Sequence, residues 1–142
     1  MTVIDVNILL YAYDSASTLH IKARAWIEET FSSTSVVGLP WQTIIAFLRI
    51  ATNPRLQGRR FTTEEAIGIV QAWIDQPNVR LLGSGEGHWQ ILSDLLINGQ
   101  VRGPIASDAE LAALTVEYGG ILNTTDRDSA RFPGLRWTNP LT

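Results

Sequence analysis

The sequence predicts an α/β fold, in which strands alternate with helices around a mostly parallel sheet. Short apolar runs typical of buried strands alternate along the chain with segments of helical periodicity, and this alternation indicates a parallel sheet. Acidic residues also stand where elements begin or end. Asp5 closes the first apolar run, Asp108 opens a helix, and Asp126 follows the apolar run 120–123. Strand ends of a parallel sheet gather along one edge, where ligands bind.

The expected elements follow in chain order. Strands are expected over residues 2–5, 35–38 and 79–82, and helices over residues 7–13, 20–30, 40–52, 62–75, 87–97 and 107–118. Pro40 suits the first turn of its helix. Thr62 with Glu65, and Ser107 with Glu110, have the spacing of capping boxes that open two further helices.

The helix after Ser107 separates its acids onto two faces. At about 100° per residue, Glu110 and Glu117 lie roughly opposite Asp108, which places Asp108 outside the acidic solvent face. A first-turn acid that complements the helix dipole, worth about 0.3–1 kcal/mol, is the alternative interpretation of Asp108. Helix capping is the alternative for Asp5 and for Asn7.

A cluster of carboxylates at one sheet edge would need a cation. Two carboxylates about 4 Å apart repel by roughly 4 kcal/mol at an effective dielectric near 20, so several of them require a metal or raised pKa values. Mg²⁺ takes oxygen ligands and typically binds through one or two carboxylates plus phosphate oxygens. At a phosphodiester it activates a water and neutralises the departing oxygen. The predicted reaction is metal-assisted phosphodiester hydrolysis.

Composition limits the other options. The 142 residues are expected to form one domain, residues 1–142. Because the chain has no cysteine, disulfides, thiolate zinc sites and a cysteine nucleophile are excluded. A basic leader and an apolar run long enough to span a bilayer are both missing, so the chain is expected to be cytoplasmic, with no membrane partner.

A basic segment offsets the net charge of −3. Residues 30–63 contain no Asp or Glu, and the segment carries four candidate RNA-binding arginines, Arg49, Arg55, Arg59 and Arg60. The planar guanidinium suits bidentate phosphate contact. The alternative is a solvated turn with its arginines facing water.

The tryptophans divide into two groups. Base stacking is one use for such side chains. Trp26 and Trp73 sit at helical spacing among aliphatic residues, so they are expected in the core. Trp41, Trp89 and Trp137 have no assignment from the sequence.

Six segments in order along the chain carry a resemblance to a known family. They are residues 4–12 (IDVNILLYA), 38–41 (GLPW), 46–54 (AFLRIATNP), 107–114 (SDAELAAL), 125–128 (TDRD) and 131–137 (RFPGLRW). Together they resemble the PIN-domain ribonucleases, and within these the VapC-type toxins of bacterial toxin–antitoxin pairs.

The resemblance implies a three-layer α/β/α sandwich with a mostly parallel central sheet. It also implies endoribonuclease activity on RNA that depends on Mg²⁺ or Mn²⁺, a homodimer, and an inhibitory antitoxin of the VapB type. Residues carried over by motif are the catalytic and metal-binding acids Asp5, Asp108 and Asp126, Asp128 as a fourth metal ligand, and Asn7 and Thr125 as supporting polar groups. The family usually has Glu three positions before the arginine matching Arg49, where this chain has Ala46. A one-metal site is therefore an alternative to a two-metal site.

Two rival functions stay open at this point. The missing carboxylate at Ala46 fits a catalytically inactive PIN-like module that binds RNA or a protein. A phosphatase of the haloacid-dehalogenase type also begins with an Asp after a strand. That class needs a second Asp where this chain has Asn7, and a lysine, whereas the sole lysine, Lys22, lies in an amphipathic helix.

Overall fold

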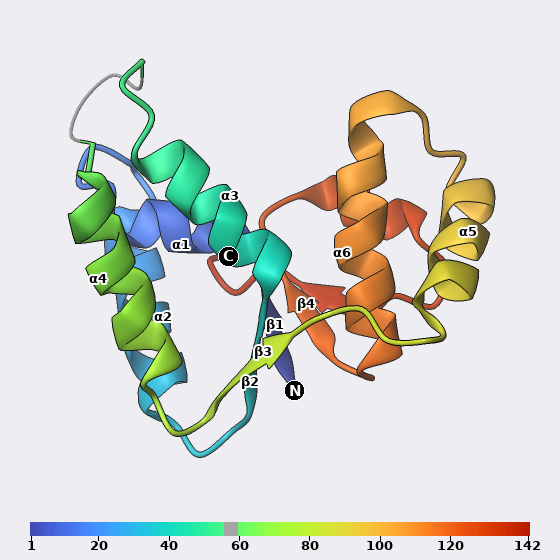
Figure 1. The fold of residues 1–142 in the computed structure, drawn as a ribbon, viewed down its shortest axis with the longest axis horizontal. Helices are drawn as coiled ribbons and strands as arrows, with labels where there is room; N and C mark the ends of the chain where they lie inside the picture. Colours follow the sequence, from blue (N-terminus) through green and yellow to red (C-terminus); the bar gives the residue numbers. More distant parts are fainter. Residues whose placement is uncertain (56–59) are drawn as a thin grey trace.

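A five-stranded parallel sheet forms the centre of the molecule in the computed structural model, which describes residues 1–55 and 60–142 (Figure 1). Its strands are β1 (Thr2–Ile4), β2 (Val37–Pro40), β3 (Val79–Leu82), β4 (Ile121–Asn123) and β5 (Trp137–Thr138). They lie in the order β3-β2-β1-β4-β5, and every pair is parallel. The predicted parallel sheet is confirmed.

The strand order reverses at β1. From β1 the chain builds β2 and β3 on one side, then returns to add β4 and β5 on the other. Ile4 is paired with Asn123, and the Asp5 N–H donates to the Asn123 carbonyl at 3.1 Å. In open α/β sheets, ligands bind at the carboxyl ends of strands where the order reverses. Asp5 and the residues after Asn123 lie at that point.

Helices cover both faces of the sheet (Figure 1). On one face pack α1 (Val6–Ala12), α2 (His20–Ser32), α3 (Trp41–Ala51) and α4 (Thr63–Ile74), and on the other α5 (His88–Asn98) and α6 (Ala106–Glu117). Two 3₁₀ turns, η1 (Gly103–Ile105) and η2 (Arg127–Arg131), precede α6 and follow β4. The three-layer α/β/α sandwich is therefore confirmed. Among the described residues, every helix is too short or too polar to cross a bilayer.

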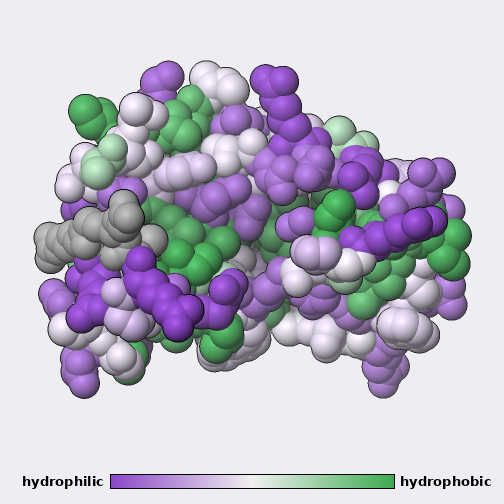
Figure 2. All heavy atoms as spheres, turned by 90° about the horizontal axis from the view of Figure 1, so that it is seen from above, coloured by the Kyte–Doolittle hydropathy of each residue, from purple (hydrophilic) through white to green (hydrophobic). Residues whose placement is uncertain are grey.

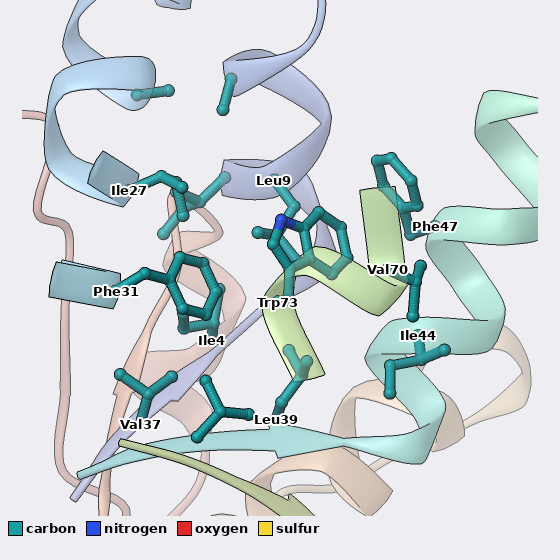
Figure 3. Close-up of a cluster of buried hydrophobic side chains, with 14 of the residues drawn as sticks. Ile4, Leu9, Ile27, Phe31, Val37, Leu39, Ile44, Phe47, Val70 and Trp73 are labelled. Carbon is teal, nitrogen blue, oxygen red and sulfur yellow. The ribbon is translucent and has the colours of Figure 1, made fainter. Parts of the chain in front are cut away.

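Separate apolar cores lie on the two faces of the sheet. Neighbouring strand residues point to opposite faces, so Ile4 joins the core under α1 to α4 while Val3 joins the core under α6. In the larger core, Trp73 packs against Phe47 with ring centroids 4.7 Å apart (Figure 3). Trp26 packs partly buried against the same core, as the helical spacing predicts. These cores hold rigid the strand ends that carry the acidic residues.

The starts of two helices test the predicted capping boxes. Thr62 and Glu65 form the predicted reciprocal pair at the start of α4. The second box, at Ser107, is wrong. The chain enters α6 through the 3₁₀ turn that contains Pro104, so the helix starts at Ala106 and Ser107 already lies inside it. Asp108 still falls in the first turn of α6.

The acids of α6 do not form the solvent face expected from the helical wheel. His88 at the start of α5 is buried, with Nδ1 2.9 Å from Glu117 and Nε2 3.4 Å from Glu110. Glu117 also accepts the Gly85 N–H at 2.7 Å. Helix α5 packs along α6 and covers this side, so His88 and Glu117 tie the loop after β3 to the helix that carries Asp108.

Candidate active site

Asp5 lies where β1 ends and α1 begins, and both of its carboxylate oxygens accept a hydrogen bond. The Val6 N–H donates to Oδ1 at 2.7 Å, which makes Asp5 the N-cap of α1. The Thr124 hydroxyl donates to Oδ2, also at 2.7 Å. Asp5 does cap α1, as the alternative interpretation proposed. Capping uses one carboxylate oxygen, and the other oxygen faces β4.

Thr124, directly after β4, forms hydrogen bonds with three residues of the site. Its side chain is fully buried. Besides donating to Asp5, its hydroxyl oxygen accepts the Asp126 N–H at 3.0 Å and the Asn7 side-chain amide at 3.4 Å. One hydroxyl therefore links the end of β1, the first turn of α1 and the loop that carries Asp126.

The sequence pointed to Thr125 for the supporting hydroxyl, whereas the structure gives that place to Thr124. Thr125 is half-buried, and its hydroxyl has no hydrogen bond among the residues that the structure describes. The choice between the two threonines follows from the pairing of Ile4 with Asn123, which sets Thr124 beside Asp5. That register joins distant segments and cannot be read from local sequence.

The other acids approach from two further elements. Asp126 caps η2, with its Oδ1 accepting the Asp128 N–H at 2.9 Å. Asp128 is exposed in the first turn of η2, and Asp108 is half-buried in the first turn of α6. The acids thus come from the ends of β1 and β4 and from the start of α6.

The pKa values show that the carboxylates act on one another. Burial raises the pKa of Asp5; hydrogen bonds from Thr124 and the Val6 N–H oppose that rise, and the charge of Asp126 adds to it. Burial also raises the pKa of Asp108, and the charges of Asp126, Asp5 and Asp128 raise it further. Asp108 therefore lies within electrostatic reach of the other three predicted acids, and such a cluster of carboxylates favours a cation.

A basic residue that the sequence did not single out also acts on this pocket. The Arg131 guanidinium, at the end of η2, opposes the rise in the pKa of Asp108. Its Nη1 lies 3.5 Å from the Gly99 carbonyl, and its buried Nε has no partner among the described residues. Arg131 stands five residues after Asp126 in the same stretch, which is the one sequence signal that could have marked it.

The site offers carboxylate and amide oxygens as ligands for a divalent metal. Within residues 1–55 and 60–142, no three His, Asp or Glu side chains form a ready-made ligand group. The predicted acids therefore do not form a complete ligand set by themselves, although Thr124 brings Asp5 and Asp126 to one hydroxyl. Mg²⁺ needs only one or two carboxylates beside water and phosphate, and the buried Asn7 Oδ1, which has no partner among the described residues, adds an oxygen donor. The residues present fit such an ion.

Of the four predicted RNA-binding arginines, Arg49 has the clearest place. It lies in the last turn of α3 and lines a cavity together with Ala46 and Ser107, the residue before Asp108. Arg55 and Arg60 are exposed on the segment after α3. Arg59 lies outside the described residues. RNA contact by these side chains stays a prediction.

Comparison with known proteins identifies the family of this chain. The family model described as PIN domain matches residues 2–135. The chain belongs to the PIN-domain family. Ribonuclease VapC33 of Mycobacterium tuberculosis is 38% identical over 141 residues, 99% of each chain. Ribonuclease VapC37 of the same organism is 34% identical over 140 residues, 99% of this chain and 97% of the relative.

Solved structures of PIN proteins share the fold. M. tuberculosis VapC20, described as a sarcin-ricin loop cleaving toxin, matches with a TM-score of 0.68 and 15% identity, over 96% of this chain and 99% of that one. VapBC2 from Rickettsia felis, bound to a DNA fragment from its promoter, matches with a TM-score of 0.70 and 11% identity, over 97% of each chain. At these identities the likeness concerns the fold alone.

Proposed function

We propose that this PIN protein is a metal-dependent endoribonuclease and the toxin of a toxin–antitoxin pair. The observation that carries the proposal is the convergence of Asp5, Asp108 and Asp126 at the point where the strand order reverses, with Thr124 joining two of them. The full-length relatives named as VapC ribonucleases support RNA as the substrate.

The metal of this proposal is Mg²⁺, with Mn²⁺ as the alternative. Asp5, Asp108 and Asp126 would hold it, with Asp128 and the Asn7 carbonyl oxygen as further oxygen donors. When bound, such an ion activates a water and neutralises the charge that develops on the leaving oxygen. The raised pKa values of Asp5 and Asp108 support the choice, because they reflect the cost of charging both carboxylates without a counter-ion.

The protein's own groups orient the reaction. Thr124 and the Val6 N–H fix the two oxygens of Asp5, so the carboxylate cannot rotate away from the scissile phosphate. Asp108 is half-buried, so water can reach it, and a carboxylate oxygen that does not bind the metal can accept a proton. Asp108 is therefore the proposed general base for the attacking water.

The proposed partners follow from the same family. VapBC2 of Rickettsia felis is a toxin–antitoxin complex of this fold, and we extend the arrangement to a VapB-type antitoxin that inhibits this chain. A homodimer acting on RNA in the cytoplasm completes the proposal.

Cleavage mapping of total RNA tests the function. The wild type should give discrete fragments with Mg²⁺ and none with EDTA, whereas Asp5→Asn should give none under either condition. Asp94→Asn is the matched control, because Asp94 is an exposed acid on α5 whose one hydrogen bond among the described residues comes from the Gln90 side chain. It should cut like the wild type.

Two outcomes would replace the proposal. RNA binding without metal-dependent cleavage by the folded wild type would assign the chain to the inactive PIN-like binding modules. Turnover of p-nitrophenyl phosphate without RNA cleavage would point to a phosphatase.

A further inference from the structure

A cleft between α3 and α6 adjoins the acidic site. It has a volume of about 380 Å³ and is lined by one face of α3 and the first turn of α6, through Trp41, Gln42, Ile45, Ala46, Arg49 and Ser107. Helices α3 and α6 stand on either side of the molecule's centre in Figure 1. Ser107, which lines the cleft, precedes the proposed catalytic acid Asp108 in the first turn of α6.

Trp41 supplies a flat apolar wall to this cleft. Its side chain is 50% exposed and belongs to neither core, although it starts a helix that packs on one of them. Ile45, one turn further along α3, is 58% exposed. An exposed indole beside a phosphodiester-cleaving site can stack on any base, because every base has a π-face.

Arg49 supplies a cation at the other end of the same helix face. Among the residues that the structure describes, Arg49 forms no ion pair, so its guanidinium is available to a phosphate. Among the residues that the structure describes, no carboxylate lines this cleft. Ala46 lies between Trp41 and Arg49 on this face of α3. The Ala46 methyl group is small and uncharged, so it leaves space in the cleft for a nucleotide.

A hydrogen bond joins the two sides of the cleft, and a second cavity adjoins it. The Gln42 side-chain amide donates to the Ser107 carbonyl at 2.9 Å, which ties α3 to α6. A second cavity of about 430 Å³ shares Gln42 and Ser107 and extends over Ala106 and Glu110. Figure 2 shows the molecule from above, with hydrophilic residues predominating and hydrophobic ones emerging between them in patches. Such a mixed surface suits a ligand that carries both bases and phosphates.

We propose that the cleft between α3 and α6 is a nucleotide subsite, in which Trp41 stacks on an unpaired base and Arg49 contacts an adjoining phosphate. The inference rests on the proposed ribonuclease function and adds two contacts of this chain to it, a base on the Trp41 indole and a phosphate on Arg49. RNA is favoured over a protein occupant because the cleft pairs an unneutralised cation with a flat aromatic surface beside the catalytic acids.

Abasic scanning tests the subsite. Single-stranded RNA oligonucleotides that each lack one base, at successive positions, are titrated by fluorescence anisotropy against protein carrying Asp5→Asn, which prevents cleavage. One abasic position should weaken binding at least about fivefold, the range measured for base stacking on an aromatic side chain. With Trp41→Ala added, that position should no longer differ from its neighbours, whereas Trp41→Phe should keep the difference.

Two controls match the variants. Trp89→Ala removes a more exposed tryptophan that lines neither cavity, and it should keep the abasic effect. Arg49→Ala should weaken binding at all positions and flatten its salt dependence, while Arg24→Ala, which removes an arginine already paired with Glu28 on α2, should not.

The outcomes separate the subsite from the function. The subsite is wrong if Trp41→Ala keeps the abasic effect, or if it leaves RNA binding unchanged while abolishing dimerisation or antitoxin binding, which would make the cleft a protein interface. Either result can occur while the wild type still cleaves RNA with Mg²⁺. Loss of that cleavage in the folded wild type would instead overturn the proposed function.

Discussion

Thr124→Val should damage the active site without unfolding the protein. The change replaces a fully buried hydroxyl by a methyl group of nearly the same size. Asp5 loses a donor at 2.7 Å and the Asp126 N–H loses its acceptor at 3.0 Å. A hydrogen bond to a charged group contributes about 1.5–3 kcal/mol, and a buried donor left unpaired costs about 1–3 kcal/mol. The two contributions share one hydroxyl and do not add in full, so we expect the free energy of unfolding to fall by about 2–4 kcal/mol, out of the 5–15 kcal/mol common for such domains.

The same substitution should weaken metal binding. The Thr124 hydroxyl lowers the pKa of Asp5, so its loss lets that pKa rise further and favours the protonated carboxyl, a poorer metal ligand. Groups that orient metal ligands typically account for about 10–100-fold in affinity or activity. The half-saturating Mg²⁺ concentration for RNA cleavage should therefore rise by at least about tenfold, measured beside urea unfolding at pH 7.

Neighbouring residues provide the controls. Thr124→Ser keeps the hydroxyl and should restore most of the cleavage. Thr125→Val removes the hydroxyl that lacks a hydrogen bond among the described residues and should change stability and Mg²⁺ requirement little. A larger effect at Thr125 than at Thr124 would refute the reasoning and return the supporting role to the residue that the family motif predicted.

Three further predictions concern charge and metal. Asp108→Asn should abolish RNA cleavage yet raise the free energy of unfolding at pH 7. The fold raises the pKa of Asp108 above 3.8, so the contribution of this carboxyl to stability is full below about pH 3.8 and is lost as pH rises through its folded-state pKa. The advantage of the variant in urea unfolding should therefore grow from pH 4 to pH 7, and a constant difference would contradict the cause given. Mg²⁺ at 100 times its Kd should stabilise the wild type by about 2.7 kcal/mol, and equal stabilisation of Asp5→Asn would place the ion elsewhere. Ala46→Glu should lower the Mg²⁺ concentration needed for half-maximal cleavage, since the cleft leaves room for a carboxylate; Ala46→Gln, with the same shape and no charge, should not.

The sequence predicted what depends on local pattern. Apolar runs and helical periodicity located β1, β3 and the six helices, but they placed β2 two residues early and did not predict β5. The position of Asp5, Asp108 and Asp126 at element ends predicted a common edge. Errors came where neighbours distant in sequence decide the outcome. The α2 helix buries Ala23, Ile27 and Phe31, whereas the apolar side chain of Ile21 on the same helix is 81% exposed.

The details of the site depended on non-local pairing. The register of β1 on β4 selected Thr124 rather than Thr125, and the packing of α5 on α6 turned Glu117 from a solvent-facing acid into a partner of His88. The turn that contains Pro104 moved the start of α6 ahead of Ser107. None of these contacts leaves a periodic signal in the chain.

The hydrogen bond between Thr124 and Asp5 joins residues 119 positions apart. During synthesis, which runs from the N-terminus, Asp5 emerges early and has to wait for Thr124 and β4 before its carboxylate is fixed. Contacts of such long sequence separation form slowly and late in folding. On the proposed function, the active site of a nascent chain therefore stays incomplete until β4, in the last sixth of the chain, has been synthesised.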